Sequence, residues 1–232
     1  MTTVTISRDF GSEGDLLARK IANNLGYHYV DKEIIGNLLE HYGFVEFDRE
    51  YETLPGFWAK FNAQRDKRRD MMVDMLNRSL EAFAVHGNAV ILGRSGFSVL
   101  GGYADVFHIR FQAPFHARVK RLMQEENLTH LEAATICEEG DRVRSEFIRN
   151  YYGISLDNVH AFDLTLNTDK VPFDLIAKIS VDCIKAFNAK PKTEKPTTAM
   201  IEVDSVLTRA VNDLLNCKIE HSESKPILEM QH

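Results

Sequence analysis

The first 25 residues constrain the fold of this chain most strongly. A short run with β-branched residues, Val4 to Ile6, is followed by two glycines, Gly11 and Gly14, and then by apolar residues at helical spacing as far as Leu25. This order predicts a strand, a tight loop and a helix. Backbone N–H groups of such a loop and of the first helical turn converge on one spot, which favours an anion. The residues predicted to contact phosphate are Gly11, Ser12, Glu13, Gly14, Asp15 and Leu16.

The loop is compared with the nucleotide-binding P-loop, G-x-x-x-x-G-K-[ST], in which the lysine contacts the β- and γ-phosphates and the hydroxyl binds magnesium. In that frame Arg8 takes the first glycine position, Glu13 the second, Gly14 the lysine position and Asp15 the Ser/Thr position. The lysine is absent. We interpret Arg8 as the catalytic cation that replaces it, because a guanidinium can bridge two phosphate oxygens. The alternative is that Arg8 pairs with Asp9, Glu13 or Asp15 and only neutralises the loop.

Composition indicates an ordinary soluble globular protein. The chain has 232 residues, 44% of them hydrophobic and 27% charged, and a formal net charge of −6. This charge argues against general binding to nucleic acid or to an acidic membrane surface. Three widely separated cysteines, without C-x-x-C spacing, fit neither a zinc site nor a disulfide framework. Without a leader-like segment or a long apolar run, a cytoplasmic location is expected.

Further strands are predicted along the chain, and polar residues follow two of them. Tyr27–Val30 leads into Asp31, and the continuous apolar run Ala89–Leu92 leads into Gly93 and Arg94. Carboxyl ends of parallel strands meet at one edge of a sheet, where open α/β sheets bind ligands. Asp31 and Arg94 are therefore predicted to bind substrate, with Arg94 on a phosphate rather than in a structural ion pair. The remaining predicted strands are Val106–Phe111 and Phe162–Thr168.

Helical patterns are predicted after these strands. A short helix is expected from Leu131 to Glu139, followed by an arginine-rich segment from Asp141 to Arg149. If that segment is helical, Arg142 and Arg149 lie near one face while Arg144 lies off it. Residues 43–66 are irregular and aromatic-rich, which fits either a cover for a substrate pocket or a mobile flap.

A change in composition predicts an appended C-terminal segment. The predicted domain spans residues 1–188, residues 189–199 form a polar linker, and residues 200–232 form an amphipathic helix with a flexible tail. An isolated amphipathic helix is unstable in water, so this helix must dock on the domain, on a second copy or on another protein partner.

Four segments together resemble the cytidylate kinase-like family, a branch of the P-loop nucleoside monophosphate kinases. They are Ser7–Gly14, Leu25–Glu33, Val90–Arg94 and Asp141–Arg149. The resemblance implies a P-loop NTPase-like parallel sheet of about five strands, helices on both faces and a helical lid. It implies ATP and Mg²⁺ as cofactors and a nucleoside monophosphate, CMP or dCMP, as substrate. It also places Asp31 on the monophosphate side, Arg94 on the acceptor phosphate, and Arg142, Arg144 and Arg149 in the lid.

Two departures from the family pattern leave the function open. Ser95 replaces the aspartate of a Gly-Arg-Asp motif, and Gly14 replaces the P-loop lysine. The leading hypothesis is a kinase that transfers the γ-phosphoryl of ATP to a nucleoside monophosphate. The alternatives are a catalytically weak nucleotide-binding module that acts through a partner of the C-terminal helix, and transfer to an acceptor that is not a nucleotide.

Overall fold

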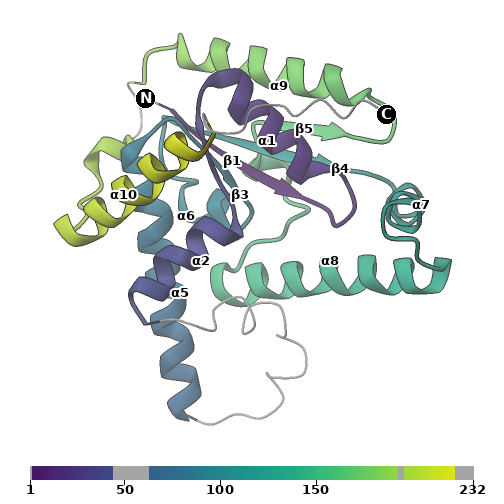
Figure 1. The fold of residues 1–232 in the computed structure, drawn as a ribbon, viewed down its shortest axis with the longest axis horizontal. Coiled ribbons are helices and arrows are strands. Elements are labelled where there is room, and N and C mark those ends of the chain that lie inside the picture. The colour runs from purple at the N-terminus through teal and green to yellow at the C-terminus, as the bar shows by residue number, and fades with distance from the viewer. Residues whose placement is uncertain (1, 44–62, 193–195, 223–232) are drawn as a thin grey trace.

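A five-stranded parallel sheet forms the centre of the molecule (Figure 1). The computed structural model describes residues 2–43, 63–192 and 196–222. Within these residues the strands lie in the order β2-β3-β1-β4-β5, and every neighbouring pair is parallel. The strands are β1 (Thr3–Arg8), β2 (His28–Val30), β3 (Ala89–Leu92), β4 (Val106–Gln112) and β5 (Leu164–Asn167).

Helices cover both faces of the sheet, which confirms the predicted α/β class. On one face α1 (Gly14–Leu25) and α9 (Phe173–Asn188) pack against apolar residues of β1, β3 and β4. On the other face lie α5 (Ala63–His86) and α8 (His130–Tyr152). The remaining helices are α2 (Lys32–His41), α6 (Gly96–Val99), α7 (Phe115–Glu126) and α10 (Ser205–Ser222), with 3₁₀ turns η1 (Val159–Ala161) and η2 (Thr198–Met200).

Alternation along β1 and β4 separates an apolar face from a polar one. Val4 and Ile6 of β1 pack toward α1, whereas the Thr3 hydroxyl donates to the carbonyl of Ala84 in α5, on the opposite face. On this second face the Thr5 hydroxyl lies 2.7 Å from Nδ1 of His108. His108 is therefore a buried strand residue with a polar partner.

Two predicted boundaries differ from the structure. The short helix and the arginine-rich segment form one continuous helix, α8, because Thr129 caps its start in a capping box and the chain turns only at Gly153, in the left-handed region with φ 65°. Helix α5 begins at Ala63, so the irregular segment is shorter than expected. Most of the predicted aromatic cover, residues 44–62, lies outside the described residues.

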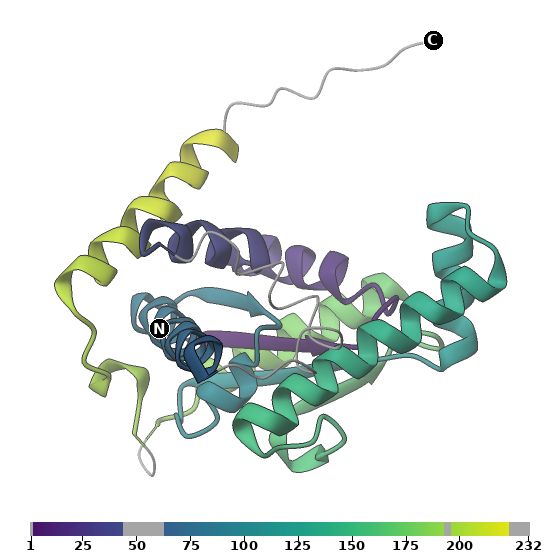
Figure 2. The ribbon, with the colours of Figure 1, turned by 90° about the horizontal axis from the view of Figure 1, so that it is seen from below.

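The C-terminal helix α10 docks on the domain itself (Figures 1 and 2). Its apolar residues join the core cluster formed by α2 and α5. The approach to the helix is also fixed, because buried Asp105 accepts hydrogen bonds from the backbone N–H and the hydroxyl of Thr198, at 2.8 and 2.7 Å. Docking on the domain was one of the three possibilities that the sequence left open. The domain boundary at residue 188 stays a prediction. No described helix is long and apolar enough to cross a membrane.

We expect Leu207→Ala in α10 to lower the free energy of unfolding by about 3 kcal/mol, because it leaves a cavity in the shared core. Leu207 is 2% exposed, whereas its neighbour Val206 is 65% exposed. Val206→Ala is the matched control and should change stability by less than about 0.5 kcal/mol. Urea denaturation followed by circular dichroism measures both. Equal, small effects would show that α10 does not dock in solution.

Candidate functional site

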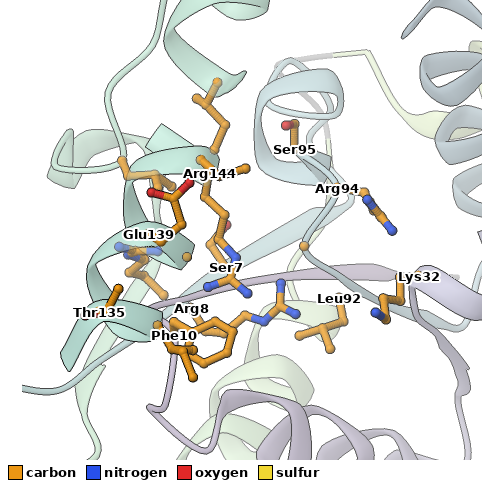
Figure 3. Close-up of a pocket in the computed structure, with 17 residues that line it drawn as sticks. Ser7, Arg8, Phe10, Lys32, Leu92, Arg94, Ser95, Thr135, Glu139 and Arg144 are labelled. Carbon is orange, nitrogen blue, oxygen red and sulfur yellow. The ribbon is translucent and has the colours of Figure 1, made fainter. Parts of the chain in front are cut away.

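A cavity of about 440 Å³ lies at the carboxyl ends of β1 and β3, beneath α8. Apolar side chains, among them Phe10, Ile136 and Ile148, form part of its wall. Figure 3 shows basic side chains that enter it from different elements. Those labelled are Arg8 at the end of β1, Lys32 in α2, Arg94 after β3 and Arg144 in α8. Arg110 in β4 also belongs to the lining. Glu139 is the acidic residue in the lining. The cavity is therefore suited to a ligand that carries several negative charges and an apolar surface.

Arg8 lies between the glycine loop and the turn that follows β3. Its Nε donates to Oδ1 of Asp15 at 2.8 Å. A Cβ atom on Gly14 would lie 2.6 Å from Cβ and 2.7 Å from Cγ of Arg8, and a Cβ atom on Gly93 would collide with its Nη1. Gly14 is therefore needed for Arg8 to extend into the cavity, whereas a side chain at Gly93 would displace only the end of the guanidinium.

The glycine loop has the backbone shape of an anion site. Gly11 has φ 73°, Glu13 has φ 58°, and buried Ser12 donates from its hydroxyl to the carbonyl of Asp9 at 2.8 Å. Helix α1 begins at Gly14 without a side-chain cap, so its first N–H groups have no intrahelical acceptor. Asp15 and Leu16 are exposed in the first turn of α1. None of the residues predicted to contact phosphate, Gly11 to Leu16, is in the lining of the cavity, which ends at Arg8 and Phe10 on this side.

Arg110 and Asp9 form a buried ion pair that the sequence did not reveal. Nη2 of Arg110 lies 2.6 Å from Oδ1 of Asp9, and the backbone N–H of Ala113 donates to the same carboxylate. Burial raises the pKa of Asp9 and lowers that of Arg110, while their attraction opposes both shifts. The buried Nε and Nη1 of Arg110 have no hydrogen-bond partner among the described residues. Arg110 is also part of the cavity lining, although these two nitrogens are buried from solvent.

A second, partly buried pair connects the loop to α8. Oδ1 of Asp141 accepts from the backbone N–H of Phe10 at 3.0 Å, and its Oδ2 lies 2.7 Å from Nη1 of Arg118. The same Nη1 donates to the carbonyl of Phe10. Gly140 faces the Phe10 ring so closely that a Cβ atom there would lie 2.7 Å from Cδ2. Contacts this distant in the chain leave no local sequence signal.

The three predicted lid arginines have different surroundings. Arg144 lines the cavity, and its guanidinium lies 5.1 Å from the centre of the Phe10 ring. Arg142 points outward and forms ion pairs with Glu139 at 2.7 Å and Glu146 at 2.9 Å. Arg149 is exposed near the end of α8 and is not in the cavity lining. The structure therefore brings Arg144 to Arg8 and Arg94, but not Arg142 or Arg149.

The predicted substrate residues also separate. Arg94 is 6% exposed, has φ 49°, and lines the cavity from the turn after β3. Asp31 caps α2 by accepting from the N–H groups of Glu33 and Ile34, and it lies 3.6 Å from Arg19. Asp31 is outside the cavity lining, whereas the next residue, Lys32, is part of it.

Known proteins are similar to this chain over most of its length. The model of the cytidylate kinase-like family matches residues 3–170. The chain belongs to this family. It is 28% identical over 194 residues to the cytidylate kinase of Halobacterium salinarum, an alignment that covers 84% of this chain and 94% of that protein. It is 28% identical over 169 residues to the cytidylate kinase of Ignicoccus hospitalis, with 72% and 90% covered.

The fold of this cytidylate kinase-like chain also matches a solved structure. An uncharacterized protein from Eubacterium ventriosum superposes with a TM-score of 0.63, at 19% identity, over 80% of this chain and 98% of the other. This likeness concerns the fold alone. Family membership and the cationic cavity together support a function related to nucleoside monophosphate kinases.

Proposed function

We propose that the protein transfers the γ-phosphoryl group of ATP to a nucleoside monophosphate, with CMP or dCMP as the preferred acceptor. The observation that carries this proposal is the convergence of Arg8, Arg94, Arg110 and Arg144 on one cavity beside a glycine loop. Phosphoryl transfer depends mainly on positioning and on cations that neutralise charge on the phosphates. A cavity with several arginines from separate elements meets that need.

In the proposed reaction the acceptor and the donor approach from two sides. An oxygen of the acceptor phosphate attacks the γ-phosphorus of ATP, the bond from that phosphorus to the β,γ-bridging oxygen breaks, and ADP leaves with the electron pair. Arg94 holds the acceptor phosphate, and the backbone N–H groups of Gly11 to Leu16 hold the phosphates of ATP. Arg144 reaches the cavity from α8 and stabilises the charge on the transferring group.

The residues present fit Mg²⁺ as a partner of ATP. This cation is usually held by one or two carboxylates together with substrate phosphates. Asp15 is 64% exposed in its side chain at the start of α1, next to the loop, and its Oδ2 is not used in the ion pair with Arg8. Asp15 would therefore hold the ion, which would neutralise phosphate charge.

A coupled assay of ADP release over a panel of monophosphates tests the proposal. With ATP and Mg²⁺, we expect CMP or dCMP to raise ADP release well above the rate without an acceptor. UMP, AMP and GMP should be poorer acceptors. Cytidine is the control, because it has the same base without the phosphate that the cavity arginines would hold.

The binding-module alternative gives a different result in the same experiment. Calorimetry would then detect binding of ATP and CMP, while ADP release would stay at the rate seen without an acceptor. The absent P-loop lysine is the observation that favours this second function. Failure to bind any nucleotide would contradict both functions.

A further inference from the structure

The position of Arg8 relative to Gly14 gives the absent lysine a physical reason. In the P-loop frame, a glycine stands at the position of Arg8 and the lysine at the position of Gly14. Here the two residue types are exchanged. A Cβ atom on Gly14 would lie 2.6 Å from Cβ of Arg8, which is closer than side chains can approach. A side chain at position 8 and a side chain at position 14 therefore exclude each other.

We propose that Arg8 and Gly14 are a reciprocal exchange of the P-loop glycine and lysine, with the cation for the transferring phosphoryl supplied from β1 instead of α1. This inference rests on the proposed function. The loss of the lysine is then the consequence of Arg8 rather than a loss of the phosphate site. It assigns Arg8 as a catalytic residue and Gly14 as the residue that leaves room for it.

The placement of the guanidinium supports this role over simple neutralisation of the loop. The bond to Asp15 uses Nε, and no hydrogen bond of Nη1 or Nη2 is found within the described part of the chain. The side chain is only 17% exposed, whereas that of Asp15 is 64% exposed. Nη1 also lies against Gly93, the residue before Arg94. The free end of Arg8 thus lies between the loop for the donor phosphates and the turn for the acceptor phosphate.

The charges around the loop show why a cation is needed there. Glu13 and Asp15 both belong to the glycine loop and its first turn, and Arg121 lies 3.5 Å from Glu13. Arg8 is the partner of Asp15. Without Arg8, the Asp15 carboxylate beside the proposed phosphate loop would have no paired cation among the described residues.

The test moves the cation back to the P-loop position. Three variants are compared with the parent: Arg8→Gly, Gly14→Lys and the double variant Arg8→Gly/Gly14→Lys. We expect Arg8→Gly to lower kcat/KM about 100-fold or more, the scale for one preorganised electrostatic contact. The double variant should recover most of this loss. Gly14→Lys alone should melt at a lower temperature than the double variant, because its side chain collides with Arg8.

A binding measurement separates this inference from the proposed function. Calorimetry with ATP and with AMP needs no phosphoryl transfer, and AMP lacks the β- and γ-phosphates. Arg8→Gly should lower the affinity for ATP about tenfold or more and leave the affinity for AMP nearly unchanged. The double variant should restore the affinity for ATP. If the parent transfers phosphate to no acceptor, the proposed function fails, but these affinities still decide the role of Arg8.

Two results would overturn the exchange. One is a folded double variant whose ATP affinity is no better than that of Arg8→Gly. The other is a change of less than about threefold in both kcat/KM and ATP affinity for Arg8→Gly. If the double variant does not fold, Arg8→Lys and Arg8→Gln replace it. If Arg8→Lys retains ATP affinity and Arg8→Gln loses it, the positive charge at position 8 binds the phosphates. Equal ATP affinities of the two variants would refute this role.

Discussion

Arg144→Ala should lower kcat/KM for phosphoryl transfer about 100-fold, because it removes a preorganised cation from the cavity. Helix α8 places this side chain over the Phe10 ring, 5.1 Å from its centre, so little reorganisation is needed for it to meet a ligand. Steady-state ADP release measures the effect, with thermal melting as the folding control. The loss should be mainly in kcat, since the contact forms with the transferring group.

Arg142→Ala is the matched comparison, two residues away on the same helix. The Arg142 side chain is 41% exposed, and the hydrogen bonds that it donates to Glu139 and Glu146 raise its pKa. Because its guanidinium is paired with two carboxylates and is not in the cavity lining, this variant should lose less than about threefold in kcat/KM. Equal losses for both variants would contradict the structural assignment. They would show that ligand binding rearranges α8 so that both arginines reach the phosphates, as family resemblance implies.

Arg110→Met should lower the free energy of unfolding by about 3–5 kcal/mol, since it leaves the buried carboxylate of Asp9 without its cation. The Arg110 side chain is 5% exposed and that of Asp9 is 15% exposed, so water cannot readily replace the lost partner. Urea denaturation at neutral pH measures the change. The double variant Asp9→Asn/Arg110→Met should recover at least half of it, because no buried charge remains.

The same variant should depend on pH in a defined direction. Burial already raises the pKa of Asp9 above its ordinary value, and removal of Arg110 removes the largest attraction that opposes this shift, leaving the smaller effects of Arg118 and the Ala113 N–H. A carboxyl group whose pKa is raised in the folded state binds its proton more tightly there than in the unfolded chain. The free energy of unfolding therefore falls as the pH rises from the unfolded pKa to the folded pKa. The stability deficit of Arg110→Met should therefore shrink as the pH falls toward 4. A deficit independent of pH would mean that cavity formation, not charge, causes it.

Local patterns were sufficient to predict the fold and part of the site. The run Val4–Ile6, the glycines and the following amphipathic helix are local signals, and the structure contains β1, the loop and α1 at those residues. The continuous apolar run before Gly93 likewise predicted a buried strand, and it placed Arg94 at the carboxyl edge of the sheet. Parallel pairing then brings these edges together.

The remaining parts of the site depend on contacts between distant residues. Arg110 alternates with apolar residues in β4, which is the pattern of an ordinary strand. Its partner Asp9 is 101 residues away, so no local pattern indicates the ion pair. Asp141 was grouped with the lid arginines, although its carboxylate binds the backbone of Phe10. The short helix predicted from Leu131 was expected to end at Glu139. In the structure the helix continues through Gly140, and the Phe10 ring occupies the space beside this glycine.

The brace at Asp141 determines how α8 can move as a mechanical body. The helix has 23 residues, which corresponds to a rod about 34 Å long. Asp141 lies near its midpoint and is tied to the glycine loop through Phe10 and Arg118. The N-terminal half of α8 also packs on α7 through the buried side chains of Ala133 and Cys137. A rod tied at its midpoint and along one half tilts only if α7 moves with it, so a tilt that carries Arg144 toward a bound nucleotide also carries α7.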